Sequence, residues 1–187
     1  DASMGGEQSV SNWELSADRA NSARELMEVS GLYTGQVREV RGEFTAAARH
    51  YLEAGQPALA VWTWFNHRDL ESERGHAPAA RELFRRVRSD DLPDADDRRV
   101  LALLRAEQFL LTGAADDAGA ELDLARWPRA HAATPLAQEL RGDALQQQGR
   151  VEQALAQYRD ALQLLSDMQY RQIERLHTKS GYVYLYR

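Results

Sequence analysis

Residues 137–165 read AQELRGDALQQQGRVEQALAQYRDALQLL and contain two amphipathic helical segments separated by a short polar turn at Gly149. Residues at fixed distances from this glycine alternate between small and large side chains: Gly142, Leu145, Ala154, Tyr158 and Ala161. Two antiparallel helices joined by a tight turn approach closely only where small side chains meet, and a large side chain fills the space beside them. The stretch therefore predicts a pair of packed antiparallel helices.

The same pattern surrounds three earlier turn glycines, Gly42, Gly75 and Gly113, and the four glycines are separated by 33, 38 and 36 residues. Five, nine and twelve residues after the glycines stand small, large and small side chains: Ala47, Tyr51 and Ala54; Ala80, Phe84 and Val87; Ala118, Leu122 and Ala125; Ala154, Tyr158 and Ala161. Seven residues before them stand Gly35, Arg68, Ala106 and Gly142. Glycine suits such turns because it adopts the left-handed cap conformation without steric cost. The repetition predicts four helix pairs.

The residue composition favours helices throughout. Alanine and leucine dominate, Ile173 is the only isoleucine, and the prolines fall between the apolar-periodic segments. Alanine, leucine, arginine and glutamate lose little conformational freedom in a helix, whereas β-branched residues favour strands. We therefore predict an all-α fold. Each helix pair leaves an apolar face uncovered, so the pairs are expected to stack into a right-handed superhelix, an α-solenoid with a concave inner face.

The copy at Ala137 to Leu165 and the segment at residues 41–54 (RGEFTAAARHYLEA) resemble the tetratricopeptide repeat (TPR) family. The resemblance covers about Val29 to Leu165. It departs at Arg68 and Glu71, where the family prefers small and large apolar residues, so the inner packing of the second pair is expected to differ. The resemblance implies a concave groove lined by the first helix of each pair.

The array is expected to form a single domain over residues 11–187. We expect residues 1–10 to be disordered or a cloning remnant. Ser11 and Glu14 form a capping box that predicts an N-terminal helix to about Val29. The acidic, proline-bearing segment 88–97 (RSDDLPDADD) predicts a long loop between repeats, and Thr134 with Pro135 predicts a helix start, with threonine as the cap.

The C-terminal segment is expected to form a half-repeat, in which Gly181 and Tyr184 take the pattern positions. A terminal cap should be polar on its outer face, yet residues 182–186 (YVYLY) are mostly apolar. We therefore expect the chain to be a piece of a longer protein. The apolar C-terminal helix could also pair with a second copy to form a homodimer.

Several classes of function are disfavoured by composition and motifs. The chain has no cysteine, and its 23 basic and 29 acidic residues give a net charge of -6, which argues against nucleic-acid binding. It shows no membrane-length apolar run or targeting segment, and we expect it to be cytoplasmic. The histidines and paired carboxylates show no ligand spacing, and no phosphate loop or catalytic motif is present. We expect no enzyme activity, metal or cofactor.

The remaining candidate for function is the groove. Counting from the turn glycines, its residues would be, copy by copy: Val29, Leu32, Gln36, Glu39 and Val40; Trp62, Phe65, Asp69, Ser72 and Glu73; Val100, Leu103, Glu107, Leu110 and Leu111; Leu136, Glu139, Asp143, Gln146 and Gln147. The strongest candidates are Gln36, Glu39, Trp62, Phe65, Asp69, Glu73, Glu107, Glu139 and Asp143. The twenty positions include six acidic residues and no basic one, so a partner is expected to meet a stronger negative field than the net charge implies.

An acidic concave surface with an aromatic patch would suit a basic or amphipathic protein partner, because carboxylates in a cleft focus their field on a ligand of opposite sign. The basic and asparagine residues with which the best known peptide-binding TPR proteins clamp a C-terminal carboxylate do not occur here. Two simpler interpretations stay open. The carboxylates could form a solvated helix face, and Trp62 and Phe65 could belong to the core between repeats.

Two functions follow. The first is a non-enzymatic adaptor or scaffold that holds a peptide or helix in the groove. The second is the sensor or oligomerisation arm of a larger protein, because the segments HYLEAGQPALAV, ARELFRRV and LLRAEQFLLTG are similar to helical repeats of bacterial signal-transducing ATPase regulators, including those like the maltose-regulon activator.

Overall fold

The computed structural model describes residue 31 and the segments 34–39, 41–165 and 170–185. The expected N-terminal helix from Ser11 to Val29, residues 1–10, and the groove positions Val29, Leu32 and Val40 lie outside the described residues. So do the side chains of Tyr184, Leu185 and Tyr186 in the apolar C-terminal segment.

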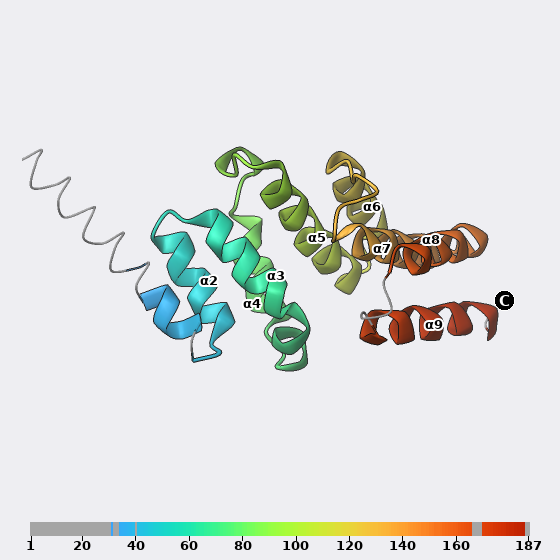
Figure 1. The fold of residues 1–187 in the computed structure, drawn as a ribbon, viewed down its shortest axis with the longest axis horizontal. Coiled ribbons are helices and arrows are strands. Elements are labelled where there is room, and N and C mark those ends of the chain that lie inside the picture. The colour runs from blue at the N-terminus through green and yellow to red at the C-terminus, as the bar shows by residue number, and fades with distance from the viewer. Residues whose placement is uncertain (1–30, 32–33, 40, 166–169, 186–187) are drawn as a thin grey trace, which may run out of the picture.

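The described residues are helical and contain no strand, which confirms the all-α prediction for this part of the chain. After a helical stretch at 34–39, the helices are α2 (Phe44–Glu53), α3 (Pro57–Glu73), α4 (Ala77–Arg85), α5 (Ala95–Leu111), α6 (Ala115–Leu124), α7 (Thr134–Gln147), α8 (Val151–Leu164) and α9 (Tyr170–Leu185), with a short 3-10 turn at Ser89–Asp91. They follow one another along the long axis of the molecule, from α2 at one end to α8 and α9 at the other (Figure 1).

The four turn glycines adopt the predicted left-handed conformation. Gly42, Gly75, Gly113 and Gly149 have φ between 73° and 78°. At the last of these turns, the Arg150 amide donates to the Leu145 carbonyl (2.8 Å) and the Gly149 amide donates to the Gln146 carbonyl (2.9 Å). This is the Schellman pattern, which satisfies carbonyl groups at the end of a helix. The same pair of bonds closes the helices that precede Gly42, Gly75 and Gly113.

Replacing Gly149 with alanine should lower the free energy of unfolding by about 1 kcal/mol, because a Cβ atom is disfavoured at this positive φ. Open space surrounds the position, so no steric clash adds to this cost. Gly149→Asn is the matched control. Asparagine tolerates the left-handed region, so its loss should be smaller in urea denaturation, and an equal loss would contradict the conformational explanation.

The repeated small and large positions form the core. Ala47, Ala80, Ala118 and Ala154 are fully buried, and the large residues nine positions after the turn glycines expose at most 2% of their surface: Tyr51, Phe84, Leu122 and Tyr158. A Cβ atom on Gly142 would lie 2.2 Å from the Tyr158 ring, and one on Gly35 would lie 2.4 Å from the Tyr51 ring. The first and fourth copies therefore bring a tyrosine ring directly against a glycine.

The second copy packs differently, as Arg68 and Glu71 led us to expect. Helix α3 packs more extensively against α2 than against α4. Glu71 is 1% exposed and accepts hydrogen bonds from the amide and hydroxyl of Thr45 on α2, while Arg74 and His76 contact its carboxylate at 3.1 and 2.8 Å. Burial raises the pKa of Glu71, but these hydrogen bonds outweigh burial and leave the pKa below its ordinary value. A buried polar cluster thus replaces the apolar contact here.

The segment 88–97 forms the predicted loop and continues into α5. Asp94 caps this helix by accepting a hydrogen bond from the Asp96 amide (2.6 Å). The predicted capping role of Thr134 is wrong. Ala133 occupies the cap position of α7, Thr134 lies inside the helix, and its hydroxyl donates to the Pro128 carbonyl (2.7 Å) instead. The threonine thereby joins the loop to the helix start.

Helix α9 packs against α8 through apolar residues. Gly181 is exposed, and nothing lies within 4 Å of a Cβ built on it. Leu176 and Val183 are buried instead and join Tyr158 and Leu155 in one apolar cluster. The pattern position of Gly181 stays a prediction, because in other copies this position faces the second helix of its own pair, as Gly142 faces Tyr158, and no such helix follows α9 among the described residues. Among the described residues, no helix is long and apolar enough to cross a membrane.

Candidate functional site

The first helices of the second, third and fourth pairs border a cleft of about 570 Å³. Helix α5 packs against α3 on one side and α7 on the other, so the three helices present neighbouring faces. The cleft is lined by Arg68, Asp69, Ser72, Glu107, Gln108, Leu110, Leu111, Leu140, Asp143, Gln146, Gln147 and Lys179. Eight of these positions belong to the predicted groove, because residues three and four apart share one face of a helix.

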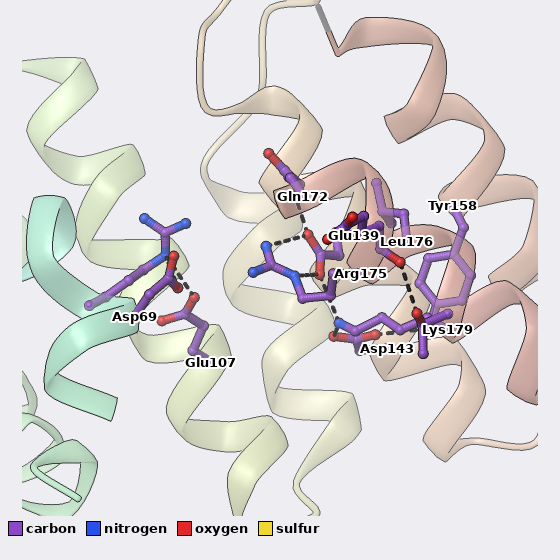
Figure 2. A network of polar contacts seen from close by, with 12 residues as sticks. Asp69, Glu107, Glu139, Asp143, Tyr158, Gln172, Arg175, Leu176 and Lys179 are labelled. Carbon is purple, nitrogen blue, oxygen red and sulfur yellow. Dashed lines mark hydrogen bonds and ion pairs between the residues drawn. The ribbon is translucent and has the colours of Figure 1, made fainter. Parts of the chain in front are cut away.

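The α7 side of the site is occupied by side chains from α9 (Figure 2). Glu139 is 1% exposed. Arg175 donates to both of its carboxylate oxygens, from Nε at 2.5 Å and from Nη2 at 2.9 Å. Lys179 Nζ lies 2.9 Å from Oε1, and Gln172 donates to Oε2 at 3.2 Å. Burial raises the pKa of Glu139, but the Arg175 hydrogen bond and the two cations outweigh it, so the pKa lies below its ordinary value.

Asp143, one turn further along α7, is bound from two helices. Lys179 Nζ lies 2.5 Å from Oδ2, and the Tyr158 hydroxyl of α8 donates to Oδ1 at 2.8 Å. Burial is the largest influence on this carboxyl group and leaves its pKa above the ordinary value despite the lysine. Glu139 and Asp143 therefore hold Lys179 between them and fix α9 over α7.

The prediction that the groove carries an excess of negative charge is wrong for its α7 side. Arg175 and Lys179 come from a helix outside the counted positions and neutralise Glu139 and Asp143. Arg68, which the sequence marked only as a departure from the repeat, contributes a third cation near Glu107. The groove positions were counted along the first helix of each pair, and this count could not reveal the positive charges that α9 places on α7.

On the α3 and α5 side the ion pairs are longer than those around Glu139. Arg68 Nε lies 3.4 Å from Glu107 Oε1 and 3.9 Å from Asp69 Oδ1, so one guanidinium group faces two carboxylates. Burial, together with the charge of Asp69, raises the pKa of Glu107 to about 7 in spite of Arg68. The neighbouring Gln108 is 8% exposed, and its side-chain oxygen has no hydrogen-bond partner.

The remaining predicted residues do not line the cleft. Trp62 donates to Asp97 (2.7 Å) and meets Phe65 edge-on at 5.7 Å, and both rings pack on the core between α3 and α5. The simpler interpretation of these rings as core is therefore confirmed. Glu39 accepts a hydrogen bond from the Tyr51 hydroxyl (2.8 Å), while Gln36 and Glu73 are exposed.

Sequence reasoning missed four of the residues that line the cleft: Arg68, Gln108, Leu140 and Lys179. It also missed Arg175, which binds Glu139. A signal existed for two of them, since Arg175 and Lys179 lie one turn apart and Lys179 is the only lysine. In the part of the chain that the structure describes, no group of three or more histidine or acidic side chains could hold a metal ion. The arrangement suits charge recognition.

No protein-family model matches the chain. A short segment is similar to Motility protein B of Escherichia coli strain K12, with 57% identity over 37 residues, and the same identity and length hold for Motility protein B of Escherichia coli O157:H7. The matched segment covers 20% of this chain and 12% of either motility protein. The match fits a bacterial origin.

Proposed function

We propose that the chain is a non-enzymatic protein-interaction module of the TPR type, in which stacked helix pairs form a right-handed superhelix and a partner binds in the cleft between α3, α5 and α7. The partner would be a basic or amphipathic segment of a protein. Support for the stacking comes from the neighbouring first helices and from the turn glycines that close each pair.

One observation carries the proposal of a basic partner. Helix α9 already lies on the α7 face and places two cations, one helical turn apart, on Glu139 and Asp143. It also buries Leu176 and Val183 beside them. A helix with cations and apolar residues on one face is therefore a ligand that these surfaces accommodate, and Asp69 and Glu107 offer carboxylates to a further segment of the same chemistry.

The test is a titration of the full chain with an arginine-rich peptide and an acidic peptide at low and high salt. We expect the arginine-rich peptide to bind at low salt and to weaken several-fold at high salt, because exposed charges are screened. Combining Asp69→Asn with Glu107→Gln should weaken this binding. Glu82→Gln, an exposed α4 carboxylate paired with Arg85 and Arg86, is the matched control and should leave it unchanged. Equal binding of the acidic peptide would overturn the proposal.

A second candidate is the sensor or oligomerisation arm of a larger bacterial protein. Support for it comes from the match to Motility protein B, in which the matched 37-residue segment makes up 12% of a longer bacterial protein. A nucleotide-binding loop upstream or a helix-turn-helix downstream in the intact gene would assign the chain to a regulator.

A homodimer through α9 is a further proposal, tested by sedimentation of the chain.

A further inference from the structure

Helix α9 meets α7 through long polar side chains and not through close helix packing. The backbones of α3 and α5, and those of α5 and α7, approach more closely than those of α7 and α9. The side chains of Gln172, Arg175 and Lys179 span the space from α9 to α7 (Figure 2). The buried apolar residues of α9, Leu176 and Val183, lie in the cluster around α8. Charge therefore holds α9 to α7, and apolar contact holds it to α8.

The cations of α9 remain within reach of the cleft. The side chains of Arg175 and Lys179 are 35% and 27% exposed, although Glu139 is only 1% exposed. Lys179 and its partner Asp143 both line the cleft in which we place the protein partner. Partly exposed ion pairs are screened by salt and contribute less than fully buried ones. A cation that enters the cleft can therefore compete with Lys179 for Asp143.

The residues with which α9 makes these contacts form a pattern along one side of the helix. They are Arg175, Leu176, Lys179 and Val183, so the first cation is followed by apolar residues one and eight positions later and by a second cation four positions later. With 3.6 residues in each turn, these four positions share one side of a helix. Proteins that bind an amphipathic helix in a groove recognise anchors of this kind.

We propose that α9 is an internal ligand, which in the free chain occupies the surface that the partner binds. This surface, here called the α9-binding surface, consists of Glu139 and Asp143 on α7 with Leu155 and Tyr158 on α8. The partner would be a helix with the same pattern of cations and apolar residues as α9. The inference rests on the proposed function and adds the sequence pattern of the partner and its competition with α9.

Competition by α9 lowers the affinity for the partner by the fraction of time in which the α9-binding surface is free. A surface that is free for about a tenth of the time binds the partner about tenfold more weakly than a surface that is always free. Weakening the attachment of α9 should therefore strengthen the binding of a helix added from outside. A helix that only completes the fold would show no such effect.

The experiment uses a peptide of residues 170–185 with blocked ends, and the same peptide with Arg175→Gln and Lys179→Gln as the control probe. Fluorescence anisotropy at low salt measures the binding of each peptide to the full natural chain and to the full chain that carries both substitutions. We expect the natural peptide to bind the variant chain about tenfold more tightly than the natural chain, because the variant α9 no longer holds the carboxylates. The control probe should bind neither chain.

Arg85→Gln combined with Arg86→Gln gives the matched control chain. It removes two arginines that pair with an exposed carboxylate on α4, and it changes the net charge by the same amount. This chain should bind the natural peptide no better than the natural chain does. Lys179→Gln alone is a milder variant, because it keeps both bonds from Arg175 to Glu139. It should give an intermediate gain, and no gain would overturn the inference even if the double variant does not fold.

The outcomes separate this inference from the proposed function. Equal affinity of the natural peptide for the natural and variant chains, or equal binding of the two peptides to the variant, would overturn the role of α9. If the arginine-rich peptide binds both chains equally well, α9 does not cover the partner's site, and the proposed function stands without this inference. If the arginine-rich peptide binds neither chain while the natural peptide binds the variant, the α9-binding surface is supported and the basic partner is overturned.

Discussion

Replacing Glu139 with glutamine is expected to lower the free energy of unfolding by about 2–3 kcal/mol and to release α9 from α7. Glutamine keeps the size of the side chain but removes the charge that faces Arg175 and Lys179. Breaking a buried ion pair usually costs about 3–5 kcal/mol, and the two cations here are partly exposed, which reduces the loss. Urea denaturation measures the total loss, and faster hydrogen exchange of the α9 amides locates it.

Asp123→Asn provides the matched control. Asp123 also pairs with an arginine, Arg141 at 3.1 Å, but its side chain is 78% exposed. Exposed pairs contribute at most about 1 kcal/mol, so this variant should hardly change stability. Unchanged exchange of the α9 amides in Glu139→Gln would contradict the view that Glu139 fixes the helix.

The pH dependence of the α9 contact follows from the sign of the shift at Glu139. Its pKa in the folded protein lies below the ordinary value, because the hydrogen bonds and charges of α9 outweigh burial. The contact therefore contributes fully above the unfolded pKa of about 4.3 and is lost as the pH falls through the lower, folded value. Acid should detach α9 in the natural chain, whereas Glu139→Gln should show no such step.

The helix pairs could be predicted because their signals are local. Turn glycines such as Gly149 and small residues such as Ala154 act within one helix and its neighbour along the chain, so fixed offsets reveal them. The eight cleft positions followed from the same periodicity. The all-α class could be predicted without the repeat pattern, because the amino-acid composition alone favours helices.

The rest depended on contacts between segments that are distant in sequence. The partners of Glu139 lie 33 to 40 residues further along the chain, and nothing near Glu139 indicates them. The burial of Glu71 likewise depends on Thr45 of the preceding pair. Glu139 stands on the groove face in the helical pattern but is buried by α9, whose cations decide its role. Glu71 stands at an inner position, where hydroxyl and amide groups of another helix replace an apolar contact.

Gly142→Ala is expected to lower the free energy of unfolding by about 2 kcal/mol, although alanine is the better helix former. A Cβ atom would lie 2.2 Å from the Tyr158 ring. The ring cannot move aside cheaply, because it is fully buried and its hydroxyl donates to Asp143 and contacts Gln146 at 2.9 Å. Thermal and urea denaturation of the purified variant would measure the loss.

Gly119→Ala is the matched control for helix propensity. Gly119 lies inside α6, and nothing stands within 4 Å of its Cβ position. This substitution should raise stability by about 0.5–1 kcal/mol, so the two glycine-to-alanine changes are expected to have opposite signs. A stabilising Gly142→Ala would show that α7 and α8 do not approach as closely as the glycine permits.

The third repeat supplies the compensating change. It has Ala106 and Leu122, both fully buried in one cluster, where the fourth has Gly142 and Tyr158. Tyr158→Leu alone should destabilise the chain by leaving a cavity beside Gly142. Adding Gly142→Ala in that background should be neutral or stabilising, because the new methyl group enters the space that the ring vacated. A coupling energy of about 2 kcal/mol would show that the two side chains at this contact are matched in size, so that a larger residue on the first helix requires a smaller one on the second. Additive losses would show instead that the glycine and the tyrosine are independent, and the repeated pattern would then need another physical origin.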